Sequence, residues 1–205
     1  MLGDEAYAGS RNFYHLEAAV QNYYGYKYLV PTHQGRGAEH LISRSLIKEG
    51  DVIPGNMYFT TTRLHQELAG GRFVDVIIDE AHDPTNMHPF KGNVDLGKLE
   101  DVIQRVGAAK IPYVSLAGTV NMAGGQPVSM ANVQALRELC DRYGIRLYLD
   151  ATRMAENAWF IPVSYTHLRA HETVLDLVCR LLLDKNTNTT LSPHTATPYS
   201  HYTRL

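Results

Sequence analysis

The hydrophobic residues of this chain recur in two periods, one typical of strands and one typical of helices. Short runs rich in β-branched and aromatic residues predict buried strands. Between them, apolar residues three or four positions apart predict amphipathic helices that begin near Ser or Thr and end near Gly. The expected strands cover residues 26–30, 57–59, 72–78, 111–117 and 145–149, and the expected helices cover residues 11–24, 38–47, 60–70, 95–106 and 130–143.

Strands and helices alternate in this way through the first three quarters of the chain. This order predicts an α/β fold with a mostly parallel sheet flanked by helices. Ligands of such sheets bind beyond the carboxyl ends of the strands. The residues that directly follow each expected strand are therefore the first candidates for a functional site.

A Gly-rich turn at residues 31–39 joins the first of these strands to its helix. Gly35 and Gly37 would let the backbone approach an anion, and the first N–H groups of a helix have no partner within it. Arg36 adds a guanidinium that can hold a phosphate with two hydrogen bonds. The pattern favours a phosphate site, and the alternative is a plain strand-to-helix turn with a surface arginine. His40 stands where the dinucleotide fingerprint needs its third glycine, which disfavours a dinucleotide.

Three other side chains follow expected strands at the same edge, namely Phe59, Asn121 and Asp150. A phosphate cup, an aromatic ring, a polar amide and a carboxylate together suit pyridoxal 5'-phosphate (PLP). This cofactor needs a ring to stack on and an acid that keeps its pyridine nitrogen protonated, so that it can accept the electrons of a carbanion. A metal site at residues 79–83 is the weaker interpretation, because adjacent acids in a loop more often form a solvated edge.

Composition narrows the class of protein further. The chain has 205 residues, of which 44% are hydrophobic and 20% charged, so most of it can fold around a core. The net charge of −2 gives no electrostatic reason to expect nucleic acid or an anionic membrane as a partner. Two cysteines far apart, Cys140 and Cys179, fit a reducing cytoplasm. No apolar run approaches the roughly 20 residues that span a bilayer, and the first residues lack the features of a signal peptide.

Several longer strings identify a family. They are GDEAY at residues 3–7, PTHQGRGAE at 31–39, NMAGGQPVS at 121–129 and DATRMAENA at 150–158. With these strings, residues 1–161 closely resemble the tyrosine phenol-lyase and tryptophanase family of β-eliminating lyases. The resemblance implies an aminotransferase-like large domain of PLP fold type I, present here in incomplete form. It also implies a homotetrameric parent enzyme that uses a monovalent cation, usually K+.

The resemblance assigns roles to residues of the turn and of the strand ends. It implies that PLP contacts Gln34, Gly35, Arg36, Phe59, Asn121, Asp150, Thr152 and Arg153. The first three match the phosphate-binding residues, and Phe59 matches the ring that stacks on the cofactor. Asn121 and Arg153 match the residues that address the 3-oxygen of PLP. Asp150, with Thr152 beside it, matches the acid that faces the pyridine nitrogen.

The catalytic assignments also rest on the resemblance. Tyr7 matches a general acid that protonates the leaving group in the neighbouring subunit's site, although spacing alone would make it a packed loop aromatic. Glu5 matches a ligand of the K+ ion. Thr60 matches a threonine near the phenol oxygen of tyrosine phenol-lyases, where tryptophanases carry an acid, and Arg153 completes the catalytic set. These residues favour L-tyrosine as substrate, with products phenol, pyruvate and ammonia; the alternative is L-tryptophan, with indole in place of phenol.

One residue of the family is not found. Its lysine, which links covalently to the cofactor, follows the aspartate in a Ser-x-Lys-Lys string, and Lys185 is the only lysine after Lys110. We therefore expect residues 1–161 to be part of a PLP-binding large domain, and residues 162–205 to be a poorly ordered, artefactual tail outside the family. The chain by itself is expected to be an inactive lyase fragment. The alternatives are a remnant that keeps only a phosphate cup, and a nucleotide-binding module.

Overall fold

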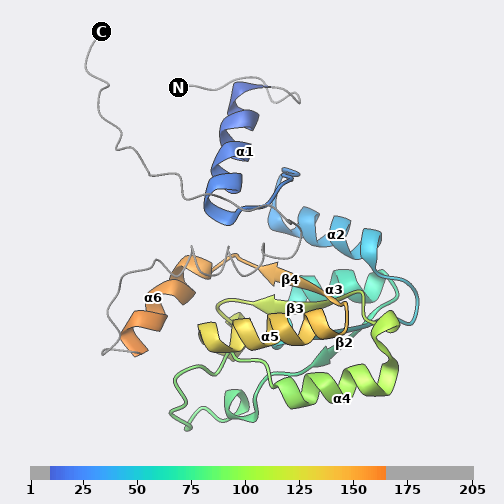
Figure 1. Ribbon diagram of the computed structural model, residues 1–205, viewed down its shortest axis with the longest axis vertical. Coiled ribbons are helices and arrows are strands. Elements are labelled where there is room, and N and C mark those ends of the chain that lie inside the picture. Colours follow the sequence, from blue (N-terminus) through green and yellow to red (C-terminus); the bar gives the residue numbers. More distant parts are fainter. Residues whose placement is uncertain (1–9, 165–205) are drawn as a thin grey trace.

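A computed structural model describes residues 10–164, and the side chains of residues 10–161. Its described strands form one parallel sheet in the order β2-β1-β3-β4 (Figure 1). The strands are β1 (Val52–Gly55), β2 (Arg72–Asp75), β3 (Tyr113–Ala117) and β4 (Arg146–Asp150). The α-helices are α1 (Arg11–Tyr24), α2 (Gly35–Leu46), α3 (Thr60–Leu68), α4 (Leu96–Val106), α5 (Met130–Arg142) and α6 (Met154–Ser164). The predicted α/β fold with a parallel sheet is confirmed.

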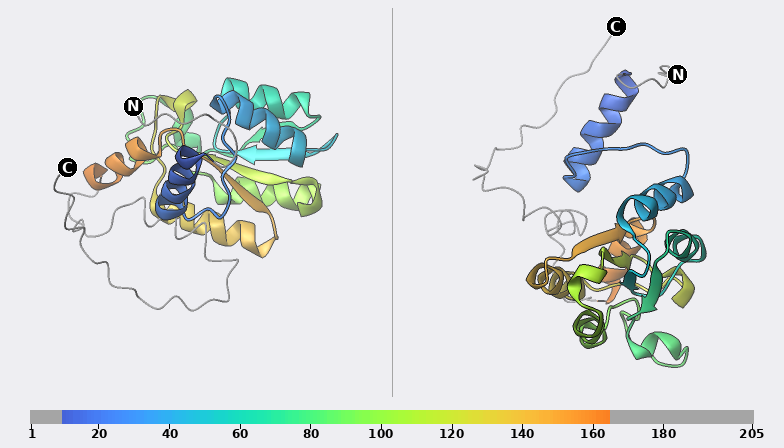
Figure 2. Two further views of the ribbon diagram at one scale, coloured as in Figure 1. Left: turned by 90° about the horizontal axis from the view of Figure 1, so that it is seen from above. Right: turned by 90° about the vertical axis from the view of Figure 1, so that its right-hand side faces the viewer.

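The sheet lies between two layers of helices. In Figure 2 (left), α2 and α3 lie on one side of the strands, and α4 and α5 lie on the other. Successive residues of a strand point to opposite faces, and β3 follows this rule. Val114 and Leu116 belong to the core under α4 and α5, whereas Tyr113 belongs to the smaller cluster under α2.

Helices α1, α3, α4 and α5 begin within one residue of where the sequence predicts, and α2 begins three residues earlier. Ser10, Asp95 and Ser129 are N-caps whose side chains each accept a hydrogen bond from a backbone N–H of the first turn. Such a bond satisfies one of the N–H groups that the start of a helix leaves without a partner. Gly25 then ends α1 in the left-handed conformation, with φ of 66°.

The second strand was placed wrongly from the sequence. Residues 57–59, predicted as a strand, are not one, and the strand is instead Val52–Gly55. Pro54, Gly55 and Asn56 are typical of a turn, but here Gly55 pairs with Ser115 in the middle of the sheet. A Cβ atom on Gly55 would lie 2.8 Å from the Ser115 carbonyl oxygen, so this glycine serves the close approach of two strands rather than a turn.

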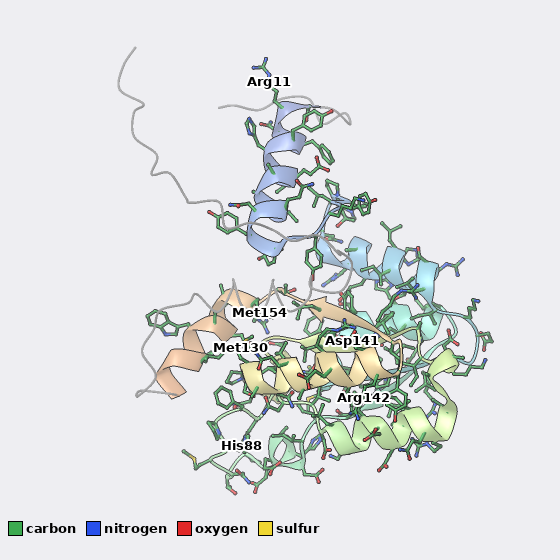
Figure 3. All side chains as sticks on the ribbon, viewed as in Figure 1. Arg11, His88, Met130, Asp141, Arg142 and Met154 are labelled. Carbon is green, nitrogen blue, oxygen red and sulfur yellow. The ribbon has the colours of Figure 1, made fainter. Side chains whose placement is uncertain are left out.

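Residues 26–30 are also not the predicted buried strand. Tyr28 and Val30 are 76% and 75% exposed, and no strand of the described residues pairs with this segment. Helix α1 has no buried residue, and its side chains, from the labelled Arg11 downward, stand clear of the layered body (Figure 3). A strand forms only where a partner supplies its hydrogen bonds, and residues 10–164 contain no such partner.

The carboxyl end of the described part is helical. Helix α6 runs through Ile161, the predicted limit of the family sequence, to Ser164. The boundary between residues 161 and 162 stays a prediction, because residues 165–205 lie outside the described part. Within residues 10–164, no helix combines the length and apolar character needed to cross a membrane.

Candidate functional site

A cavity of about 360 Å³ opens at the carboxyl ends of the strands. Its walls come from four segments: the start of α2, the chain between β1 and α3, the loop after β3, and the loop after β4. The eight residues predicted to contact PLP all line it, namely Gln34, Gly35, Arg36, Phe59, Asn121, Asp150, Thr152 and Arg153. Thr60 is not among the lining residues, but its neighbours Phe59 and Thr61 are.

The start of α2 forms one wall of this cavity. The helix begins at Gly35, earlier than the predicted residue 38, so the glycines of the turn lie in its first turn. That turn contains no acidic residue, and a Cβ atom on Gly35 would meet nothing within 4 Å. The Arg36 guanidinium is exposed and makes no hydrogen bond or ion pair with another side chain of residues 10–161. A helix N-terminus with open space and an unpaired arginine suits a phosphate dianion.

The opposite wall is made by the residues after β4. Thr152 donates to Oδ1 of Asp150 through its backbone N, at 3.1 Å, and through its hydroxyl, at 2.6 Å. These bonds hold the half-buried Asp150 carboxylate at the cavity. Arg153 donates to Oδ1 of Asn121 at 2.5 Å, which joins the loops that follow β3 and β4.

An aromatic ring also lines the cavity. Phe59 is the N-cap residue of α3, and its ring is 38% exposed at the cavity. The chain turns toward it at Met57, which has a positive φ of 66° and donates its backbone N–H to Asp75 at 3.1 Å. An exposed, fixed aromatic ring offers a planar ligand a surface to stack on.

Asn56 is a buried residue whose role the sequence did not reveal. Its amide donates to the carbonyl oxygens of Gly92 and Ala117, at 2.8 and 2.9 Å, and its Oδ1 accepts from the Ala117 N–H at 2.8 Å. Two of these bonds fix the residue after β1 against Ala117 at the end of β3, where the cavity opens, and the third ties it to the loop at Gly92. The position follows a Pro-Gly pair, which made it look like a turn residue.

Glu39 lines the cavity and was not among the predicted site residues. Its Oε1 accepts from the Thr62 hydroxyl at 2.5 Å, while its Oε2 is buried without a hydrogen-bond partner among residues 10–161. Burial raises the pKa of Tyr148, and the nearby charges of Asp150 and Glu39 raise this pKa further. A sequence signal existed, because Glu39 lies one helical turn after Gly35 and Arg36 in the same string.

Three residues of the sequence hypothesis have no described position. Tyr7, Glu5 and Lys185 lie outside residues 10–164, so their predicted roles are not placed by the structure. Within residues 10–164, no group of three His, Cys, Asp or Glu side chains gathers to hold a metal ion. Residues 79–82 form a short 3₁₀ helix, in which Asp79 pairs with Lys98 at 2.5 Å.

The residues around the cavity fit PLP by their chemistry: a helix start with a free arginine for the phosphate, a ring for stacking, and a carboxylate for the pyridine nitrogen. A family comparison supports the same interpretation. A model of the β-eliminating lyase family matches residues 1–179. The chain belongs to this family. The match extends past Ile161, while the curated relatives align over 161 residues.

Those relatives carry the name tyrosine phenol-lyase. The Nostoc punctiforme protein of that name is 74% identical over 161 residues, which are 78% of this chain and 34% of the relative. The Symbiobacterium thermophilum protein is 73% identical over the same share of this chain and 35% of the relative. The β-eliminating lyase chain therefore spans about a third of the length of the curated relatives it matches.

Solved structures show the fold alone. An archaeal alanine:glyoxylate aminotransferase is 25% identical, with a TM-score of 0.52 over 67% of this chain and 33% of that chain. The aspartate aminotransferase of Thermotoga maritima is 16% identical, with a TM-score of 0.51 over 66% of this chain and 34% of that chain. The fold is the aminotransferase-like fold of PLP-dependent enzymes, as the sequence resemblance implied.

Proposed function

We propose that this chain forms the PLP-binding part of a carbon–carbon lyase that β-eliminates L-tyrosine to phenol, pyruvate and ammonia. The observation that carries the proposal is that eight residues from four separate segments line one cavity at the ends of the strands. A structural role for these residues would not require them to meet around open space. The tyrosine phenol-lyase relatives support the substrate class.

Different residues around the cavity would bind different parts of the cofactor. Gln34, Gly35 and Arg36 hold the phosphate through the start of α2, where the helix dipole favours negative charge. Phe59 stacks on the ring. Asp150, held by Thr152, would keep the pyridine nitrogen of the cofactor protonated. When bound, PLP supplies an electron sink for the carbanion formed at the substrate's α-carbon.

Asn121 and Arg153 act as a pair. Arg153 donates to Asn121, and the family resemblance supports the proposal that both side chains would address the 3-oxygen of the cofactor. The Arg153 guanidinium would stabilise the anionic form of that oxygen. We propose that this pair sets the protonation of the cofactor's 3-oxygen.

The choice between tyrosine and tryptophan rests on Thr60 and on the names of the relatives. Thr60 lies next to Phe59 at the start of α3, and the family resemblance supports its hydroxyl as the partner of a phenol oxygen; tryptophan cleavage to indole and pyruvate is the alternative. Tyr7 as the acid for the leaving group, Glu5 as a K+ ligand and a homotetramer are further parts of the proposal, supported by the family resemblance alone.

We further propose that these 205 residues by themselves do not turn over substrate. No lysine is among the described residues that line the cavity, and Lys185 is the only lysine after Lys110. Without that amine the cofactor has no covalent anchor, and the substrate's α-proton has no lysine base.

Cofactor titration tests the binding site. PLP is added to the purified chain, and binding is followed by absorbance and protein fluorescence, with pyridoxal and NAD as comparison ligands. We expect PLP to bind in preference to both, and Arg36→Ala to weaken PLP binding about tenfold, the scale of one charge-assisted phosphate contact. Preference for NAD, or equal binding of PLP and pyridoxal, would contradict the proposal.

A turnover assay tests the reaction. The 205-residue chain with added PLP is expected to release no phenol from L-tyrosine, and borohydride is expected to fix no cofactor to Lys185. The second protein is the one encoded by the open reading frame that contains this chain, with a downstream lysine where the DNA supplies one. It is expected to release phenol from tyrosine faster than indole from tryptophan. Faster release of indole would favour the tryptophanase alternative.

A further inference from the structure

The hydrogen bond between Thr62 and Glu39 links the two helices that form the cavity wall. Glu39 lies one turn after Arg36 on α2, and Thr62 lies one turn after Phe59 on α3. The Thr62 hydroxyl donates to Oε1 of Glu39 at 2.5 Å, and both side chains are half-buried. The bond therefore joins the helix that carries Arg36 to the helix that follows Phe59.

Glu39 has a second possible partner on its own helix. Arg36 precedes it by three residues, and oppositely charged side chains at this spacing on a helix attract one another. Nevertheless, Arg36 makes no ion pair among residues 10–161, and Glu39 is held by Thr62 on the neighbouring helix. The guanidinium is thereby left available at the start of α2.

The bond to Thr62 leaves one oxygen of the Glu39 carboxylate unsatisfied. Its Oε2 is buried without a hydrogen-bond partner among the described residues, and a buried carboxylate oxygen normally finds one. A swing toward Arg36 would give this oxygen a charged donor. Retaining Glu39 against Thr62 leaves an unsatisfied acceptor but keeps the arginine free.

We propose that Thr62 is a positioning residue that holds the Glu39 carboxylate away from Arg36, so that Arg36 can bind the phosphate of the ligand. Thr62 does not itself touch the ligand; it acts by removing an internal competitor for the guanidinium. The inference rests on the proposed PLP phosphate site, and it predicts an effect on the phosphate group in particular rather than on the ring.

The test is a set of titrations of the 205-residue chain with PLP and with pyridoxal, which lacks the phosphate. Thr62→Val removes the hydroxyl and is expected to raise the Kd for PLP two- to fivefold, roughly the range of a partly exposed ion pair, with the Kd for pyridoxal unchanged. Thr62→Ser keeps the hydroxyl and is expected to bind PLP as the wild type does. The double variant Glu39→Gln/Thr62→Val has no carboxylate to compete and is expected to recover wild-type affinity or better.

The single variant Glu39→Gln distinguishes this inference from the alternative that the Thr62–Glu39 bond only holds α2 against α3. If the bond only ties α2 to α3, Glu39→Gln and Thr62→Val should both loosen PLP binding, and the inference is overturned. If Glu39 is a competitor, Glu39→Gln binds PLP at least as tightly as the wild type, and this measurement decides the matter even where Thr62→Val fails to fold. A wild type that does not prefer PLP to pyridoxal refutes the proposed function and the inference with it. A wild type with that preference and a Thr62→Val variant equal to it refutes the inference alone.

Discussion

The two faces of the sheet bury different kinds of side chain. Under α4 and α5, the core is a continuous apolar cluster to which both helices contribute, including Leu99 and Leu136 with no exposed surface. Under α2 and α3, the apolar cluster is small and centres on Ile47, Ile53 and Tyr113. This face also contains hydrogen-bonded polar side chains. Gln66 donates to the Tyr113 hydroxyl at 3.3 Å, and Glu39 accepts from Thr62.

This difference shows how one sheet can serve both stability and binding. Burying apolar area is the main source of stability, and the α4/α5 face supplies most of it. The α2/α3 face leads into the cavity, and there the chain keeps polar and charged groups that a ligand can use. Tyr148 and Asp150 alternate with Leu147 and Leu149 on β4, so a single strand presents one kind of residue to each face.

Removing a side chain from the apolar face should have the largest effect. Leu136→Ala leaves a cavity at a fully buried position of α5, and we expect it to lower the free energy of unfolding by about 2–5 kcal/mol. Urea denaturation followed by circular dichroism measures this. The matched control is Leu41→Ala on α2, where the side chain is 50% exposed and the expected change is within about 0.5 kcal/mol. Equal losses would remove the contrast between the faces.

High pH should lower the free energy of unfolding through the buried thiol of Cys140 on the apolar face. Burial raises the pKa of this thiol to about 12, whereas an unfolded thiol titrates near 8.5. The folded chain therefore keeps a proton that the unfolded chain loses, so stability is unaffected below about pH 8.5 and falls as the pH rises toward 12. At pH 10 the expected loss is about 1.5–2 kcal/mol. Cys140→Ala should lack this pH-dependent loss. Parallel profiles of the free energy of unfolding against pH for the two proteins would contradict the prediction.

On the polar face, loss of one hydrogen bond should lower the free energy of unfolding by less than either change on the apolar face. Tyr113→Phe removes the acceptor of the buried Gln66 amide, and we expect the free energy of unfolding to fall by about 1 kcal/mol. The double variant Gln66→Leu/Tyr113→Phe replaces both partners by apolar groups and should recover part of that loss. Urea titration of the four proteins gives the coupling between the residues, and strictly additive losses would show that the bond contributes nothing.

The smallest effect is expected outside both faces, in the segment after α1. Val30 is exposed, and no buried residue lies on α1, so Val30→Ser should change the free energy of unfolding by less than about 0.5 kcal/mol. The measurement is the same urea titration. A loss comparable to that of Leu136→Ala would mean that this segment packs against the body in solution.

The sequence predicted the parallel sheet, the helices and the Ser caps because those features depend on local patterns. Ser10, Asp95 and Ser129 satisfy N–H groups within their own helices, which makes their effect readable from a few residues. The failures involve partners distant in sequence. Gly55 lies in a strand because the backbone of Ser115 approaches it, and residues 26–30 lack a strand partner although their composition suits one.

The candidate site divides in a similar way. Gln34, Gly35, Arg36 and Asp150 stand in recognisable strings, and all four line the same cavity, although the strand expected before Gln34 is absent. Asn56 and Glu39 were missed, because the amide of Asn56 bonds residues 36 and 61 positions away, and Glu39 bonds a hydroxyl 23 positions away. No local pattern reports such bonds.

The sequence by itself determined the class of fold, the lyase family and the residue types that a PLP site needs, since periodicity and motif spacing carry that information along the chain. Only the tertiary structure decided that Glu39 is held by Thr62 while Arg36 is left free, and that one face of the sheet is apolar and the other polar. The physical reason is that hydrogen bonding and burial depend on distances through space, and the fold sets these by bringing separate segments together.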